Sequence, residues 1–383
     1  MGSAEAGGTA TPPIKALYFY LTEDCNLACR HCWLAPRFAP AGDGGRSLPV
    51  ELFDTAIREA LPLGLGGVKL TGGEPLLHPH FARLLEIVRR DDLAVTIETN
   101  GLLCTPAVAA DIARCSRRFV SVSIDGADAE THDWVRGVPG SFEAARRAVV
   151  SLAAAGIRPQ IVHTLMRRNS GQAEAMLRMA EALGAGSVKF NLVQPAARGE
   201  RLHERGDALS IAELIALGRH VARELAPTTS LRVFFDYPAA FQPLTRMATG
   251  DGCGVCGILG ILGVIASGHY ALCGIGEQLP GLVFGEVGTD RLEMVWRDHA
   301  ILRALRAGLP GRLEGVCGQC LMKERCLGAC VAQSYYGAWS LWAPFWFCRQ
   351  AHEAGLFPAS RLGTGPTQAP DSSPGCDERD SVS

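Results

Sequence analysis

The sequence lacks the features typical of nucleic-acid-binding, membrane-spanning and exported proteins. Lys and Arg together number 37 against 39 Asp and Glu, so the formal net charge is only −2. Binding of phosphate backbones needs a basic face, and we therefore expect no nucleic acid as main partner. No apolar run approaches the ~18 residues of a membrane span, and no early apolar segment resembles a signal peptide. We expect a protein outside the membrane and not exported.

Cysteine, by contrast, is abundant, with 14 in 383 residues. In a short exported chain this would predict disulfides, but a long chain without an export signal favours metal binding. The length and the 48% hydrophobic content suit a globular protein of two or three domains. The polar segments 1–14 and 357–383 are expected to be disordered.

Between residues 15 and 236, short β-rich runs alternate with amphipathic helical runs. This alternation predicts parallel strands joined by helices, with ligands at the carboxyl ends of the strands. Periodicity alone leaves a doubly wound sheet and a partial barrel open. The predicted strands are 16–21, 67–70, 94–98, 119–124, 160–165 and 187–192, with a closing strand at 231–235. The predicted helices between or after them are 49–60, 80–90, 105–114, 141–155, 171–183 and 210–226.

Three cysteines, Cys25, Cys29 and Cys32, follow the first predicted strand with the spacing C-x3-C-x2-C. Three thiolates do not complete a four-ligand site, and on a [4Fe–4S] cube they leave one iron open for a ligand that is not protein. A zinc loop that takes a fourth ligand such as His31 is the alternative, which spacing alone leaves open.

Polar residues also follow the next three strands. Gly72, Gly73 and Glu74 follow the second, where glycines let backbone approach a ligand and an ionised carboxylate, which only accepts hydrogen bonds, suits an ammonium group. A tight strand-to-helix turn is the plainer interpretation of these residues. Asn100 ends the third strand and Ser123 the fourth, where helix caps or Asx turns explain polar residues equally well.

Together these motifs resemble the radical S-adenosylmethionine (radical SAM) superfamily, whose members split SAM at a [4Fe–4S] cluster to make a 5′-deoxyadenosyl radical. The resemblance implies a partial (βα)6 TIM-like barrel over residues 15–236, with Cys25, Cys29 and Cys32 holding the cluster. It also implies that the SAM-binding residues are Gly72, Gly73 and Glu74 for the amino group, Asn100, Ser123 for the ribose, Arg136 for the carboxylate and Leu192 beside the adenine.

A second group of cysteines lies in residues 237–356 and ends in the spacing C-x2-C-x5-C-x3-C-x17-C. This pattern resembles the SPASM extension of radical SAM enzymes, which holds two auxiliary [4Fe–4S] clusters. The resemblance assigns Cys253, Cys256, Cys273 and Cys330 to one cluster and Cys317, Cys320, Cys326 and Cys348 to the other. Whether Cys253 and Cys256 both bind iron stays open, and a zinc ribbon at Cys317, Cys320, Cys326 and Cys330 is the alternative.

The resemblance implies an enzyme that modifies a ribosomally made peptide by a crosslink, a thioether or epimerisation. Sulfatase-type protein oxidation and modification of a haem precursor are the other activities it allows, and a non-catalytic electron-transfer or zinc protein is the alternative from another class. We expect a flavodoxin- or ferredoxin-type electron donor. Because the segment before Cys25 is too short for a leader-binding domain, we expect either that a separate protein presents the peptide or that the barrel binds it unaided. Iron–sulfur clusters need a reducing compartment, so the cytoplasm is expected.

Overall fold

The computed structural model describes residues 12–40, 44–243 and 256–363, and its centre is a ten-stranded, mostly parallel sheet. The strand order is β12-β11-β10-β1-β4-β5-β6-β7-β8-β9. The strands of this sheet are β1 (Ala16–Tyr20), β4 (Gly67–Thr71), β5 (Ala94–Thr99), β6 (Arg118–Ser123), β7 (Gln160–Leu165), β8 (Ser187–Leu192), β9 (Arg232–Phe235), β10 (Ile261–Val264), β11 (His269–Ala271) and β12 (Val283–Glu286). A separate two-stranded sheet pairs β2 (Asp24–Cys25) with β3 (Arg37–Phe38).

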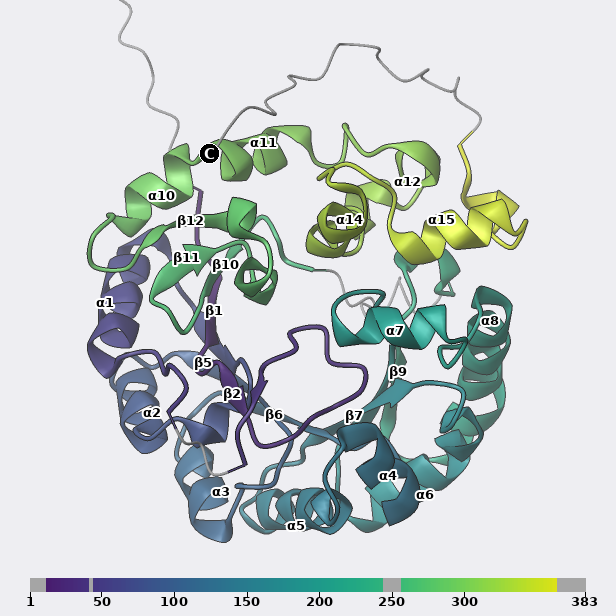
Figure 1. Cartoon of the computed structure of the whole chain (residues 1–383), viewed down its shortest axis with the longest axis horizontal. Helices are drawn as coiled ribbons and strands as arrows, with labels where there is room; N and C mark the ends of the chain where they lie inside the picture. Colours follow the sequence, from purple (N-terminus) through teal and green to yellow (C-terminus); the bar gives the residue numbers. More distant parts are fainter. Residues whose placement is uncertain (1–11, 41–43, 244–255, 364–383) are drawn as a thin grey trace, which may run out of the picture.

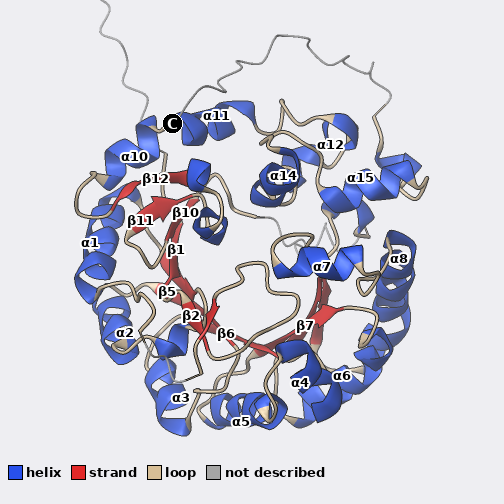
Figure 2. Ribbon diagram, in the orientation of Figure 1, coloured by secondary structure: helices blue, strands red, loops and turns tan. Residues whose placement is uncertain are grey.

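The α/β class and all seven strands predicted between residues 15 and 236 are confirmed. From β1 to β9 every neighbouring pair of strands is parallel, and β12 and β9 are the two edges of the sheet, so the barrel is open. Figures 1 and 2 show the strands curving around the centre of the molecule, with α1, α2, α3, α5, α6 and α8 outside the curve. A doubly wound sheet would carry helices on both faces, so the arrangement is that of a partial barrel.

The predicted helices are present, and several begin at residues that cap them. Thr105, Asp128 and Ser210 each accept a backbone N–H of the first turn, which satisfies a donor that the helix leaves free. The helices are α1 (Val50–Ala60), α2 (Phe81–Arg90), α3 (Pro106–Ala113), α4 (Ala129–Arg136), α5 (Ser141–Ala154), α6 (Ala173–Ala182), α7 (Arg198–Glu204), α8 (Ile211–His220), α10 (Leu292–Asp298), α11 (Ala300–Gly308), α12 (Gly315–Gln319), α13 (Lys323–Cys326), α14 (Val331–Ala338) and α15 (Trp346–Glu353).

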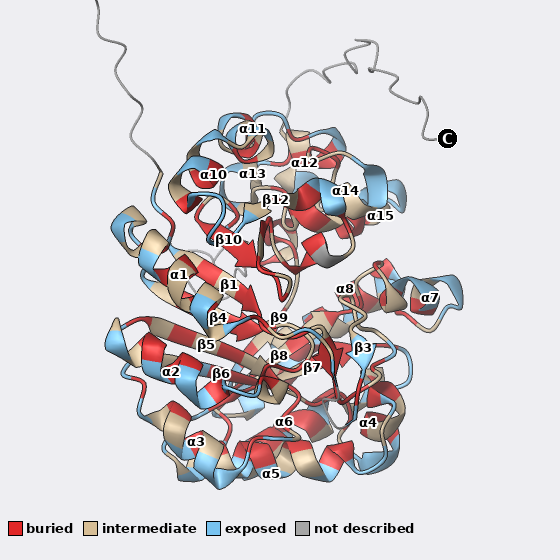
Figure 3. Cartoon of the chain, turned by 60° about the vertical axis from the view of Figure 1, so that its left-hand side comes forward, coloured by how far each residue is buried: buried red, intermediate tan, exposed pale blue. Residues whose placement is uncertain are grey.

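Buried residues concentrate on the strands and on the faces of the helices that pack against them (Figure 3). On β1, Leu17 and Phe19 are fully buried beneath α1, where Phe19 packs against Phe53 with ring centroids 4.3 Å apart. The opposite, inner face of the same strands is more polar. This asymmetry leaves room for a ligand inside the curve of the sheet.

The Cys-rich part of the chain extends the same sheet, because β10 pairs in parallel with β1. β11 and β12 then continue it in antiparallel order. The sheet is thus continuous across residue 237, and the division into domains at that residue stays a prediction. Two residues from segments expected to be disordered, Ile14 and Phe357, lie among the described residues and are buried in the core. Within the described ranges, we find no helix with the length and apolarity needed to cross a bilayer.

Candidate active site

The three cysteines of the C-x3-C-x2-C motif lie on the loop that leaves β1. Cys25 and Cys29 are buried and Cys32 is half-buried, and all three line one cavity of about 910 Å³. That volume lies within the range of small-molecule sites. The loop is fixed to the end of α4, since Ala28 and Arg30 donate backbone hydrogen bonds to carbonyls of that helix.

The carboxyl ends of the neighbouring strands, together with the end of α4, bring every predicted SAM-binding residue to this cavity. None of them lies elsewhere, although their role in binding stays a prediction. They are Gly72, Gly73, Glu74, Asn100, Ser123, Arg136 and Leu192.

The two glycines after β4 are required by the cysteine loop. A Cβ on Gly73 would lie 1.8 Å from the carbonyl oxygen of Asp24, and Gly72 has a φ of +123°, which side chains disfavour. The backbone N–H groups of Gly73 and Glu74 bond to the carbonyl oxygens of Thr22 and Asp24. The structure thus shows a contact with the loop that carries Cys25, and because both glycines also line the cavity, the close approach of a ligand stays a prediction.

Glu74 is almost fully buried and is held by three hydrogen bonds. Its Oε1 accepts the Thr99 hydroxyl at 2.6 Å and the Leu76 N–H at 3.1 Å, and its Oε2 accepts the Asn100 N–H at 2.8 Å. Burial raises the pKa of this carboxyl to about 7, although the three donors lower it. A nearby cation would favour the ionised form, so the site suits an ammonium group.

Arg136, the last residue of α4, lies beside Cys29. Its Nη2 is 2.7 Å from Oδ2 of Asp125, and its Nη1 donates to Sγ of Cys29 at 3.5 Å. The remaining Nε–H is buried and has no hydrogen-bond partner in the described structure. Since a buried donor without a partner is costly, this N–H fits an acceptor supplied by a ligand, such as a carboxylate.

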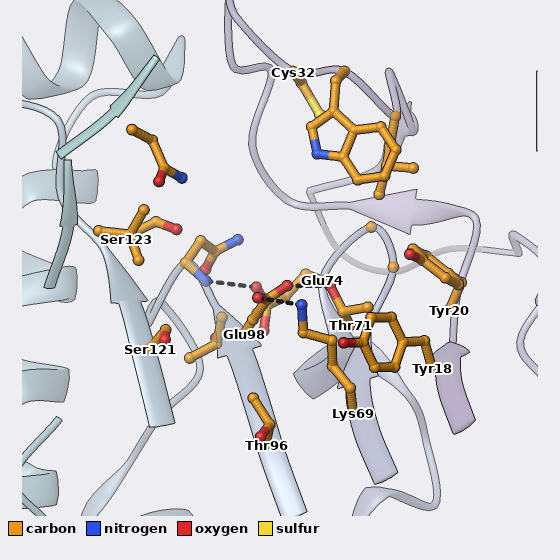
Figure 4. A pocket seen from close by; sticks show the side chains of 18 of the residues that line it. Tyr18, Tyr20, Cys32, Lys69, Thr71, Glu74, Thr96, Glu98, Ser121 and Ser123 are labelled. Carbon is orange, nitrogen blue, oxygen red and sulfur yellow. Dashed lines mark hydrogen bonds and ion pairs between the residues drawn. The ribbon is translucent and has the colours of Figure 1, made fainter. Parts of the chain in front are cut away.

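The next two predicted residues, Asn100 and Ser123, also lie at the cavity. The Asn100 side chain donates to Oδ1 of Asn26 at 2.7 Å and lies 3.8 Å from Sγ of Cys25, so it also supports the cysteine loop. Ser123 ends β6 and faces the cavity (Figure 4). Leu192 ends β8 and is buried at the cavity wall.

Sequence analysis missed an ion pair inside the cavity. Lys69 on β4 and Glu98 on β5 are joined at 2.6 Å, and the Thr71 hydroxyl donates to the same carboxylate at 3.2 Å (Figure 4). Lys69 also lies over the ring of Tyr18, 4.8 Å from its centroid. The signal was available, since polar residues at every second position of an otherwise apolar strand share one face.

Three cysteines of the first auxiliary group lie near one another. Burial and repulsion from Cys256 and Cys273 raise the pKa of Cys330, and such repulsion acts only over short distances. Cys330 also lines the main cavity, beside Gln333. Cys253 lies outside the described residues.

The second auxiliary group is complete among the described residues. The thiol of Cys317 and burial raise the pKa of Cys348, and repulsion from Cys326 and Cys320 adds to the rise. All four cysteines are free thiols here. In the described part of the chain, no set of three or more His, Cys, Asp or Glu side chains is arranged to hold a single metal ion.

An open, mostly parallel barrel with three thiols and a buried carboxylate at its mouth defines a class of ligand-binding α/β proteins. Residues 19–180 match the Radical SAM superfamily. The chain is 30% identical to the AdoMet-dependent heme synthase of Methanosarcina barkeri over 333 residues, which cover 84% of this chain and 92% of that protein. It is 29% identical to the Mycofactocin maturase MftC of Mycobacterium ulcerans over 340 residues, 88% of each chain.

The fold is similar to that of Streptococcus suis SuiB, which has been solved bound to S-adenosylmethionine. The TM-score is 0.67 at 16% identity, over 88% of this chain and 78% of SuiB. SuiB bound to its precursor peptide SuiA gives the same TM-score at 15% identity, over 88% of this chain and 76% of SuiB. The chain belongs to the radical SAM superfamily, and this membership implies a [4Fe–4S] cluster and SAM.

Proposed function

We propose that this radical SAM enzyme modifies a ribosomally made peptide with the help of three [4Fe–4S] clusters. The observation that carries the proposal is the cavity whose lining includes Cys25, Cys29 and Cys32 together with Glu74, Arg136 and Cys330. When bound, the cluster and SAM would supply a radical that abstracts hydrogen from the substrate. The residues of the chain would bind and orient SAM and the substrate and keep water out of the cavity.

The buried polar groups fit the charged ends of SAM. Glu74, fixed by Thr99 and Asn100, would accept the ammonium group, and the free Nε–H of Arg136 would donate to the carboxylate. Ser123 would contact the ribose, and Leu192 would border the adenine.

The remaining thiols would hold the auxiliary clusters. One takes Cys253, Cys256, Cys273 and Cys330, and the other takes Cys317, Cys320, Cys326 and Cys348. Proximity of the described members within each group supports this division. A ferredoxin- or flavodoxin-type protein would deliver the electron, and a separate protein would present the peptide.

A peptide is the favoured substrate because MftC is named a maturase and SuiB is solved with a precursor peptide. The polar interior of the barrel, with Lys69 and Glu98 facing the cavity, suits the hydrogen-bonding groups of a peptide. A haem precursor is the second candidate, because the 30% identical relative is a heme synthase.

The test is anaerobic reconstitution followed by reduction in the presence of SAM. We expect about twelve irons per chain, as three four-iron clusters require, and release of 5′-deoxyadenosine. Short peptides encoded beside the gene and an iron-porphyrin haem precursor are then compared as substrates by mass spectrometry. A mass or stereochemical change in a peptide supports the proposal, whereas a change in the porphyrin alone supports the second candidate. A colourless protein that binds zinc and leaves SAM intact contradicts both.

A further inference from the structure

Asp125, which the sequence motifs did not single out, is fully buried beside Arg136. It follows β6, two residues beyond Ser123. Its Oδ1 accepts the backbone N–H of Thr164 at 2.6 Å, and its Oδ2 lies 2.7 Å from Nη2 of Arg136. One oxygen thus accepts a hydrogen bond from Thr164, while the other forms an ion pair with Arg136 and has no hydrogen-bond partner among the described residues.

The backbone of Asp125 is held as firmly as its side chain. Its N–H donates to Nδ1 of His132 at 3.1 Å, and its carbonyl accepts from the Asn169 side chain at 2.9 Å. The same Asn169 amide also donates to the Thr164 carbonyl at 2.9 Å, which ties the ends of β6 and β7 together. Asp125 is therefore a rigid support rather than a mobile counter-ion.

Arg136, which is always protonated, faces the carboxylate of Asp125. Three histidines surround it: His31, whose Nε2 is 3.6 Å from Oδ2 of Asp125, together with His132 and His163. Burial lowers the pKa of His132, to about 4, and that of His163, so these two are neutral near pH 7. An unpaired buried carboxylate would be costly, so the pair with Arg136 keeps Asp125 ionised.

The three nitrogens of the Arg136 guanidinium face three different directions. Nη2 faces Asp125, Nη1 faces Sγ of Cys29, and Nε is left without a partner. An arginine is planar, so fixing one nitrogen against a rigid carboxylate also fixes the directions of the other two.

We propose that Asp125 is the positioning residue that aims Arg136 at Cys29 and at the carboxylate of SAM. The inference rests on the proposed function, because it takes SAM to be the ligand of this cavity. A buried ion pair is weak evidence for stability by itself, so a purely structural role is the alternative that the test must exclude.

The test variant is Asp125→Asn, which keeps the size of the side chain. An amide has one oxygen and one NH2 group, so in either orientation a donor faces Thr164 or Arg136. We expect SAM to bind about 10- to 100-fold more weakly, the range for losing a charged hydrogen bond. Binding is measured by equilibrium dialysis against the anaerobically reconstituted protein, with iron content measured in the same sample.

The second measurement is a cycle with Arg136→Lys, which keeps the charge and loses the fork. If Asp125 acts through Arg136, the double variant binds SAM no more weakly than Arg136→Lys alone. The matched control is Glu130→Gln, at a position on α4, the helix that carries Arg136. Glu130 forms an exposed ion pair with Arg168 away from the cavity, so the loss of this pair should leave SAM binding unchanged.

Three results overturn the inference. The first is wild-type affinity in Asp125→Asn with full iron, and the second is additive losses in the double variant. The third is loss of iron in Asp125→Asn while Arg136→Lys keeps it, which would mark a structural role. If the wild-type protein itself does not bind SAM, the proposed function fails instead, so the two failures are distinguishable.

Discussion

The two regions that carry cysteine clusters differ in what surrounds the sulfur atoms. At the barrel mouth, the sulfurs of Cys25 and Cys29 lie beside the side-chain donors of Asn100 and Arg136, although the two cysteines also pack in an apolar cluster with Leu27. In the Cys-rich region, Cys317, Cys320 and Cys348 are packed in an apolar core that includes Trp342, Phe345 and Phe347.

The two regions also differ in the number of thiols that each supplies. The motif at the mouth supplies three, whereas Cys317, Cys320, Cys326 and Cys348 form a set of four. A cube on three thiolates keeps one iron for an external ligand, and a cube on four is closed. If the proposed clusters form, this difference predicts ligand chemistry at the barrel mouth and electron storage or support in the Cys-rich region.

The largest effect is expected from Cys29→Ala. Removing one of three thiolates should eliminate the cluster at the mouth, lower the iron content by about four and reduce 5′-deoxyadenosine release to background. The control is Cys115→Ala, because Cys115 is a buried core cysteine outside the three groups. This variant should keep the iron content of the wild-type protein. Retained SAM cleavage in Cys29→Ala would contradict the role of the loop.

Replacing Cys320 separates the two regions. We expect Cys320→Ala to lose about four irons but to keep cleaving SAM on reduction, while turnover of the peptide substrate stops. Iron analysis, 5′-deoxyadenosine release and peptide mass are measured on one preparation. Unchanged peptide turnover without that cluster would reduce the Cys-rich region to a structural role.

Glu74→Gln tests the polar partner at the mouth. The pKa of Glu74 is raised to about 7 by burial, so the carboxyl becomes neutral as the pH falls below that value and then balances an ammonium group less well. Wild-type affinity for SAM should therefore fall between pH 8 and pH 6, by up to about tenfold per unit. The Gln variant should bind about tenfold more weakly at pH 8 and show little dependence on pH. A parallel pH profile in both proteins would assign the dependence to another group.

The smallest effect concerns the contact between the two regions. The Trp346 N–H donates to Oε1 of both Gln194, after β8, and Gln333, on α14, at 3.1 Å each. Trp346→Phe should lower the free energy of unfolding by about 1–2 kcal/mol, measured by denaturant titration. The control Trp339→Phe, at a position that is 72% exposed, should change it by less than about 0.5 kcal/mol. Equal stability of the two variants would show that this bond does not join the regions energetically.

The parts that sequence predicted well are those set by local pattern. Strand and helix periodicity located β1 and β4 to β9, and the resemblance to the radical SAM family singled out Cys25, Glu74 and Arg136, which line one cavity. The helix α4 was overlooked, since its pattern of polar residues had been interpreted only as a motif.

The parts that sequence did not predict depend on contacts between distant residues. The pairing of β10 with β1 joins segments far apart in the chain, and nothing local in residues 261–264 specifies that partner. Asp125 resembles any polar residue after a strand until its partners Thr164 and Arg136 are placed around it.

The most direct test of the central claim is the EPR spectrum of the reduced protein with Cys256 and Cys320 replaced by Ala, recorded with and without SAM labelled with 15N in its amino group. If the iron cluster at Cys25, Cys29 and Cys32 binds SAM, its signal changes on addition of SAM and shows coupling to the labelled nitrogen. An unchanged signal without that coupling, from a protein that has kept the cluster, would contradict the claim.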